Sequence, residues 1–247
     1  MSVWFALPSA KPPADAQPFM DAWSDMGYKL AIFRQDGVDP NIRADLVLTG
    51  PYRGWPTMCN LMAREVLERY PDTEWIVTGG DDMLPDPNKR ADEIADECSD
   101  HFGYWGGVNS DGDDAWFDGT FGVMQPIGDK WGGNWQENVH KICGSPWMGA
   151  EFVRRWNGGA GPLCTEYWHS YADEELYETV KGAGILWQRE DLSQKHVHHL
   201  RENRPQPAYM RESYNRFQAD GAIFRQRKAR GFPGWEPISI PASEVNA

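Results

Sequence analysis

Residues 75–88 of the chain read WIVTGGDDMLPDPN, an apolar strand that runs through two glycines into two carboxylates. In an open parallel sheet, ligands gather at the carboxyl ends of the strands, so Asp81 and Asp82 are expected to face a binding crevice. Adjacent carboxylates repel each other, and a hard cation such as Mg²⁺ or Mn²⁺ relieves that repulsion. A plain turn of Gly and Asp residues before the next helix is the other interpretation, and position alone leaves both open.

Strand and helix signals alternate on either side of this stretch. Apolar strands are predicted at residues 3–7, 28–33, 46–48 and 75–78, and amphipathic helices at 18–26, 56–70 and 88–102. This order predicts an α/β fold of the Rossmann-like kind, with a mostly parallel sheet and helices on both faces.

The second half of the chain has a different texture. Residues 103–142 are rich in Gly, Trp, Asp and Asn, which indicates short strands and long loops, and helices return at 149–156 and 173–181. We expect one domain over residues 1–200, with residues 201–247 as a basic helical extension and tail packed on it. The last ten or so residues are expected to form a loose tail.

Composition limits the class of protein. The chain has 247 residues, of which 40% are hydrophobic and 25% charged, enough for a sizeable core. No apolar run approaches the roughly 20 residues that span a bilayer, and the N-terminus does not resemble a signal peptide. Four scattered cysteines without a CxxC pair indicate buried thiols in a reducing compartment. A cytoplasmic protein without a membrane partner is therefore expected.

Charge is distributed unevenly along the chain. The formal net charge of −13 opposes broad binding to nucleic acid or to an anionic membrane. Residues 201–230, however, hold eight Lys and Arg residues against three acidic ones. Such a run is either a solvated helix face or a patch for phosphates, and the sequence leaves both possible.

Two later segments carry side chains suited to catalysis or to metal and phosphate binding. The run YADEEL at 171–176 places Asp173 at the start of a helix, where acidic residues are favoured in any case, but where a carboxylate can also act as a general base. The run HVHH at 196–199 puts His196 and His198 on one side of a strand, with His199 pointing away. Imidazole binds Mn²⁺-like ions and phosphates, so three histidines in four residues modestly favour a binding role over a purely structural one.

Taken together, these segments resemble the GT-A glycosyltransferases of the family-2 type, in a form that some phage enzymes share. The resemblance extends over about residues 3–200 and is carried by 52–60 (YRGWPTMCN), by 75–88 with its DxD-like end, and by the acidic motif at 171–176. Two positions depart from the family pattern. Gly80 stands where the first Asp of the DxD motif is expected, and Ala172 stands where an acid precedes the catalytic base.

The resemblance implies transfer of a sugar from a nucleotide-sugar donor to an acceptor hydroxyl, with inversion at the anomeric carbon. It implies Mn²⁺ or Mg²⁺ as cofactor, and the acceptor is a glycan, a small molecule or, less in keeping with the net charge, modified DNA. The implied roles are: catalytic base, Asp173; metal ligands, Asp82, His198 and then His196; nucleotide site, Pro8, Asp36, Arg53 and Asp81; acceptor side, Trp147.

Three alternatives remain at this stage. A nucleotidyltransferase with the same sheet fits poorly, because the loop PSAKPP at 8–13 lacks the usual glycines. A non-catalytic nucleotide- or glycan-binding module is suggested by Gly80 and Ala172. A glycosyltransferase acting on hydroxymethylated bases in DNA is permitted by the basic run, with Arg225, Arg227, Lys228 and Arg230 as its phosphate contacts.

Overall fold

The computed structural model describes residues 2–108, 114–117, 119–129, 140–199, 201–203, 205 and 211–234. Within them, a central sheet of seven strands has the order β10-β8-β9-β4-β1-β2-β3. Neighbouring strands are parallel except at β9, which runs antiparallel to both β4 and β8. The predicted fold class, a mostly parallel α/β sheet, is confirmed. The strands are β1 (Ser2–Pro8), β2 (Lys29–Gln35), β3 (Leu46–Gly50), β4 (Thr73–Val77), β8 (Val123–Pro126), β9 (Trp147–Gly149) and β10 (Leu186–Arg189).

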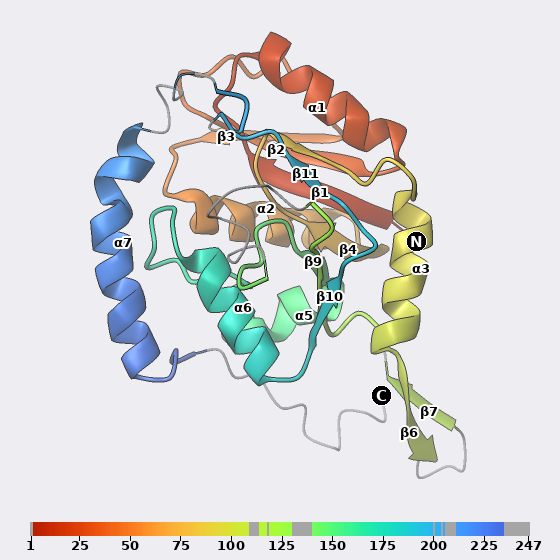
Figure 1. Ribbon diagram of the computed structural model, residues 1–247. Coiled ribbons are helices and arrows are strands. Elements are labelled where there is room, and N and C mark those ends of the chain that lie inside the picture. Colours follow the sequence, from red (N-terminus) through yellow and green to blue (C-terminus); the bar gives the residue numbers. More distant parts are fainter. Residues whose placement is uncertain are drawn as a thin grey trace.

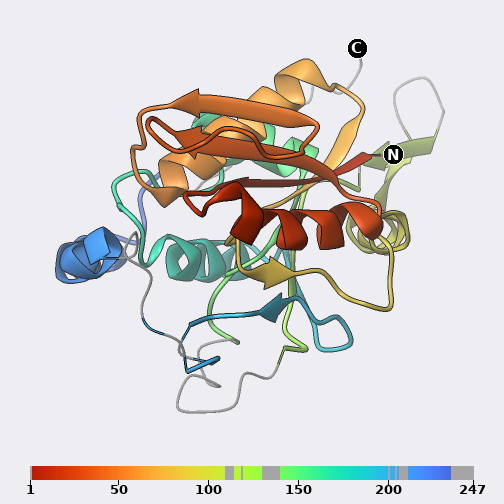
Figure 2. The same cartoon turned by 90° about the horizontal axis from the view of Figure 1, so that it is seen from above.

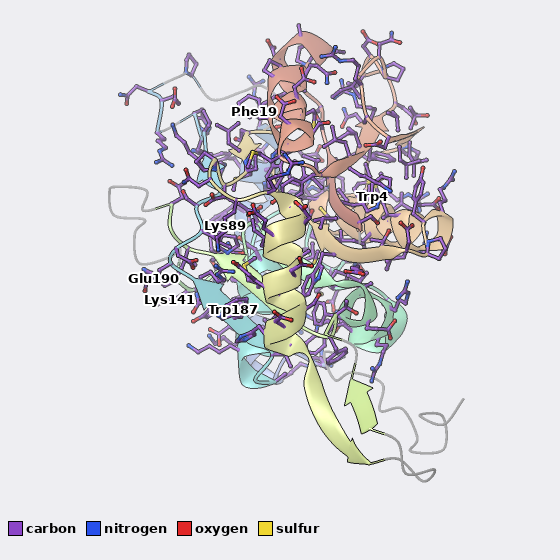
Figure 3. The ribbon with its side chains drawn as sticks, turned by 90° about the vertical axis from the view of Figure 1, so that its right-hand side faces the viewer. Trp4, Phe19, Lys89, Lys141, Trp187 and Glu190 are labelled. Carbon is purple, nitrogen blue, oxygen red and sulfur yellow. The ribbon has the colours of Figure 1, made fainter. Side chains whose placement is uncertain are left out.

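Helices cover both faces of this sheet, with α1 on one side and α2 on the other (Figures 1 and 2). In Figure 3, α3 lies in front of β10, and the ring of Trp187 stacks on His101 of that helix with centroids 4.0 Å apart. The helices are α1 (Pro13–Asp25), α2 (Trp55–Arg69), α3 (Ala91–Phe102), α5 (Ala150–Arg155), the 3₁₀ turn η1 (Trp156–Gly159), α6 (Ala172–Gly182) and α7 (Arg211–Ala229).

Strand β1 shows why the sheet is buried on both faces. Its side chains alternate in direction, so that Trp4 and Ala6 join the core beneath α2, α5 and α6. Phe5 and Leu7 join the opposite core, formed with α1 and α3. A central strand covered on both sides reads as one continuous apolar run, which is why the sequence predicted it well.

The first helix begins earlier than expected. The sequence predicted a start at Pro18, but α1 starts at Pro13 and Pro18 lies within it. Pro13 occupies the first turn, where the missing N–H has no partner to lose. Pro18 fits a first turn equally well in the sequence, so the sequence alone does not decide which proline begins the helix. The remaining predicted elements up to residue 102 agree with the structure to within a few residues.

Two short pairings and one long helix complete the described structure. Strands β6 (Tyr104–Val108) and β7 (Asp114–Phe117) form a hairpin that projects from the body below α3 (Figure 1). Strand β5 (Met83–Leu84) pairs antiparallel with β11 (Lys195–His196). Helix α7 lies beside α6 at the edge of the molecule (Figure 1). The expected loose tail lies outside the described residues.

In the part of the chain that the structure describes, no helix is both long and apolar enough to cross a membrane. All four cysteines are free thiols, and Cys59, Cys98 and Cys143 are buried as predicted, while Cys164 is partly exposed.

Candidate active site

A cavity opens at the carboxyl ends of the parallel strands. It has a volume of about 840 Å³ and is lined by residues at the ends of β1 and β2 and by residues that follow β4. Segments far apart in the sequence meet there, because the sheet, α6, the histidine run and α7 all contribute walls. The lining includes Pro8, Ser9, Gln35, Gly80, Asp81, Asp82, Trp168, His169, Asp173, Glu174, His196, His198 and Phe217.

Asp81 is held inside the protein. The Nζ atom of Lys11 lies 3.1 Å from its Oδ1 atom, and the Ser9 hydroxyl donates a 2.7 Å hydrogen bond to its Oδ2 atom. Burial raises the pKa of Asp81, while Lys11 and Ser9 oppose the rise. Asp81 lines the cavity as predicted, but its oxygens are already engaged by protein partners.

Asp82 is the more available of the two carboxylates. Its Oδ1 atom lies 3.2 Å from Nε2 of His196. Burial alone would raise the pKa of Asp82, but His196, Lys11 and His198 outweigh it and hold the pKa below its ordinary value. A Cβ atom at position 80 would lie 2.5 Å from Asp82 Oδ1. A side chain at position 80 therefore requires the Asp82 carboxylate to turn away from its present position.

Backbone pairing brings the histidine run to Asp82. His196 of β11 stands opposite Met83 of β5, and the Val197 N–H donates to the carbonyl of Asp82 at 2.8 Å. The rings of His196 and His198 are 5.0 Å apart, and both line the cavity. His199 is buried and does not line it, in keeping with the expectation that it points away.

The donor set suits a divalent ion. A carboxylate with imidazole nitrogens fits a transition ion such as Mn²⁺ better than Mg²⁺, which prefers oxygen ligands alone. Burial, together with the neighbouring His196 and His199, lowers the pKa of His198 to about 4, so at neutral pH the ring is uncharged and one of its two nitrogens is free of a proton. Among the described residues, no three His, Cys, Asp or Glu side chains already stand at ligand spacing. Asp82, His196 and His198 are therefore not at ligand spacing in this structure.

Asp173 and Glu174 approach the same cavity from the first turn of α6. That helix is entered through Tyr171, whose φ of 71° is uncommon for a residue other than glycine. Burial raises the pKa of Asp173, opposed by hydrogen bonds from its own N–H and that of Glu174. Burial and the adjacent Asp173 charge raise the pKa of Glu174 to about 7. A carboxylate of raised pKa is a stronger base than an ordinary one, and the pKa of Glu174 lies near neutral pH.

The sequence interpretation missed His169. Its imidazole lines the cavity, and its buried Nδ1 atom has no hydrogen-bond partner among the described residues. Burial lowers the pKa of His169, although Asp220 and Asp82 oppose this, so the ring is neutral at physiological pH. A single His after Trp168 carries no local signal, and only the fold places it beside Asp82.

Three predicted residues are not brought to this cavity. Trp147 is completely buried in the core, with its ring edge-on to Tyr28, so it offers no face to a ligand and the expectation of acceptor contact is corrected. Arg53 lines a separate cavity of about 720 Å³, together with Arg64 and Arg154. Asp36 is exposed just after β2 and is not part of the lining, although its neighbour Gln35 is.

Two residues near the end of the basic run, Arg227 and Lys228, already have carboxylate partners within the protein. Arg227 is buried and donates to both oxygens of Glu175, at 2.8 and 2.9 Å, and also pairs with Glu166. Lys228 pairs with Glu178 at 2.8 Å. Of the four proposed DNA contacts, these two are therefore occupied by carboxylates of the protein itself.

The chain matches no protein-family model and no curated protein sequence. Several solved structures share part of its backbone arrangement, among them the following three. A mutant of Drosophila β-1,4-galactosyltransferase 7 in complex with manganese, UDP-Gal and xylobiose is 15% identical, with 87% of this chain and 80% of that chain covered and a TM-score of 0.45. A protein from STIV is 10% identical, with 80% and 86% covered and a TM-score of 0.46. A glycosyltransferase involved in glycosylation of the major capsid of PBCV-1 is 12% identical, with 77% and 82% covered and a TM-score of 0.39. At these values, the activity must be argued from the side chains of the cavity.

Proposed function

We propose that this chain is a metal-dependent glycosyltransferase that moves a sugar from a nucleotide-sugar donor to an acceptor hydroxyl. The observation that supports it most is that Asp82 and Asp173, which come from opposite halves of the sequence, line one cavity at the carboxyl ends of the sheet. One carboxylate is paired with a histidine and the other carries a raised pKa. The two groups are thus prepared for different tasks.

The diphosphate of the donor is assigned to the side of the cavity formed by Pro8, Asp81 and Asp82. Asp82, His196 and His198 would hold a divalent ion, which when bound supplies positive charge to the departing diphosphate. Lys11 lies nearby and keeps the Asp81 carboxylate paired, so that the negative charge facing the donor is reduced. Arg53 and Asp36 belong to neighbouring surface and have no assigned contact with the donor.

Asp173 is assigned to the acceptor. Its carboxylate takes the proton of the acceptor hydroxyl while that oxygen forms a bond to the anomeric carbon. The bond from this carbon to the phosphate oxygen breaks in the same step, and the nucleoside diphosphate leaves with the electron pair. Displacement from the opposite face inverts the configuration, so NMR of the product anomer tests this role, and a retained anomer would exclude it.

The proposal is tested by the release of free nucleoside diphosphate from a panel of nucleotide-sugars, with and without Mn²⁺. Slow transfer to water requires no known acceptor. We expect Mn²⁺-dependent release from one donor, and its loss in Asp82→Ala. Metal-dependent nucleotide binding without release, even with acceptors added, would instead support the non-catalytic module. If the protein neither binds a nucleotide nor releases nucleoside diphosphate, the proposal is overturned.

A further inference from the structure

Helix α7 presents an aromatic side chain to the mouth of the cavity. In the described part of the chain, two large hydrophobic side chains are exposed, Tyr214 at 50% and Phe217 at 45%, and both belong to α7. Only Phe217 of these two lines the cavity. Single exposed aromatics are common on protein surfaces. Phe217, however, stands beside Trp168 and Tyr171 at the opening that contains Asp173.

The position of Phe217 is fixed by contacts between α7 and the cavity wall. Its ring lies 5.2 Å from that of Tyr171, and the Arg216 guanidinium lies 4.2 Å from the ring of Trp168. Below them, the buried Asp220 carboxylate accepts the backbone N–H groups of residues 168–170 at 2.9 to 3.0 Å. The aromatic wall is therefore held in place by several contacts between α7 and residues 168–171, which favours a preorganised binding surface.

Polar groups surround this wall. Asn215, Ser213 and Glu212 of α7 line the same opening, facing Asp173 and Glu174 of α6. Amide, hydroxyl and carboxylate groups around an aromatic face provide hydrogen bonds for hydroxyls and a stacking surface for C–H groups. This combination suits a sugar ring.

The charge at this end of the cavity argues against a polyanion. Asp173, Glu174 and Glu212 contribute carboxylates to the lining, whose described residues include one guanidinium, that of Arg211. Arg216, next to the lining, pairs with Glu212, so the carboxyls of Asp173 and Glu174 set the sign of the charge at this end. A nucleic-acid acceptor brings a phosphate at every nucleotide, and its binding depends on cations that neutralise them. A neutral ligand avoids that repulsion.

We propose that the acceptor is a neutral saccharide that stacks on Phe217, and that this residue of α7 determines acceptor specificity. The inference rests on the proposed glycosyltransferase function and adds the acceptor class to it. It places the specificity determinant in the basic extension, outside the segment that resembles the family.

The test compares Phe217→Ala with Tyr214→Ala, a matched control that removes an equally exposed aromatic of the same helix from outside the cavity. The probes are the p-nitrophenyl β-glycosides of xylose, glucose, galactose and N-acetylglucosamine, with a single-stranded oligonucleotide containing hydroxymethylcytosine as the anionic acceptor. We expect transfer to at least one glycoside, with the acceptor KM raised at least tenfold in Phe217→Ala and the donor KM affected much less. Phe217→Trp should restore the acceptor KM, and Tyr214→Ala should match the wild type.

Equal acceptor KM values in Phe217→Ala and Tyr214→Ala would overturn the inference, as would transfer to the oligonucleotide and to none of the glycosides. Calorimetric titration of the same glycosides onto the protein without donor separates this failure from failure of the proposed function. Saccharide binding weakened by Phe217→Ala, in a protein that releases no nucleoside diphosphate, would uphold the saccharide site and overturn the transferase. An active transferase that binds no saccharide, and whose acceptor KM is unchanged by Phe217→Ala, would uphold the transferase and overturn the saccharide site.

Discussion

Asp220 of helix α7 accepts the backbone N–H of His169 at 2.9 Å, although the two residues are separated by much of the C-terminal region. The same buried carboxylate also accepts from Trp168 and Ser170, at 3.0 and 2.9 Å. Three backbone donors of the cavity wall thus depend on one side chain of the C-terminal helix. The shape of the site is therefore tied to a segment beyond the part that resembles a known family.

This arrangement predicts a large effect of Asp220→Asn on stability. An amide has one acceptor oxygen, and its NH₂ group would face a backbone donor, so at least one of the N–H groups is left buried without a partner. We expect a loss of about 2–4 kcal/mol in the free energy of unfolding, measured by urea denaturation. Glu212→Gln in the same helix, where the exposed carboxylate pairs with Arg216, should cost less than about 1 kcal/mol. Similar costs for the two variants would contradict the role given to Asp220.

The buried pair of Arg227 with Glu175 predicts a contrast between two adjacent residues. Arg227→Ala leaves Glu175 buried without its cation, although Tyr167 still donates to it at 2.6 Å. We expect a loss of about 3–5 kcal/mol, because an uncompensated buried charge is costly. Lys228→Ala removes an exposed pair with Glu178 and should change stability by at most about 1 kcal/mol. Equal thermal shifts would show that Arg227 is not a structural residue.

Glu174 predicts a pH-dependent stability difference. Its pKa of about 7 in the folded protein lies above the ordinary value of 4.5, so its contribution is fully present below pH 4.5 and is lost as pH rises through 7. Glu174→Gln cannot ionise and escapes this loss. Relative to the wild type, the variant should therefore gain about 1–2 kcal/mol between pH 5 and pH 8, a figure reduced for solvent screening. Denaturation at both pH values checks this, and an unchanged difference would refute it.

The sequence predicted the fold well where the local pattern of apolar residues is enough to identify a strand or helix. The apolar runs of β1 and β4 and the stripe of α2 follow from local periodicity, and they appear within a few residues of the expected bounds. The antiparallel direction of β9 was not predicted, because a strand of three residues that runs directly into α5 carries no signal of direction. The start of α1 was misplaced because Pro13 and Pro18 both fit a first helical turn.

The candidate site was predictable only in part. Asp82, Asp173, His196 and His198 carry short motifs, and the fold brings all four to one cavity. Their roles stay predictions.

Other residues depend on pairings across the chain. Trp147 lies between β4 and β8, where both faces are covered, and nothing local distinguishes such a tryptophan from a ligand platform. His169 and Phe217 are placed at the cavity by contacts that include those of α7, and Arg227 of the basic run pairs with Glu175 of α6. Partners this distant in sequence cannot be read from a single chain.

The central claim is that Asp82 holds the metal that binds the diphosphate, while Asp173 serves the acceptor in the same cavity. Calorimetric titration of UDP and GDP with and without Mn²⁺, on the wild type, Asp82→Asn and Asp173→Asn, tests it most directly. We predict that Mn²⁺ tightens binding of one nucleotide at least tenfold in the wild type and in Asp173→Asn, and not in Asp82→Asn. An effect of Mn²⁺ that persists in Asp82→Asn, or that is absent from the wild type, would contradict the claim.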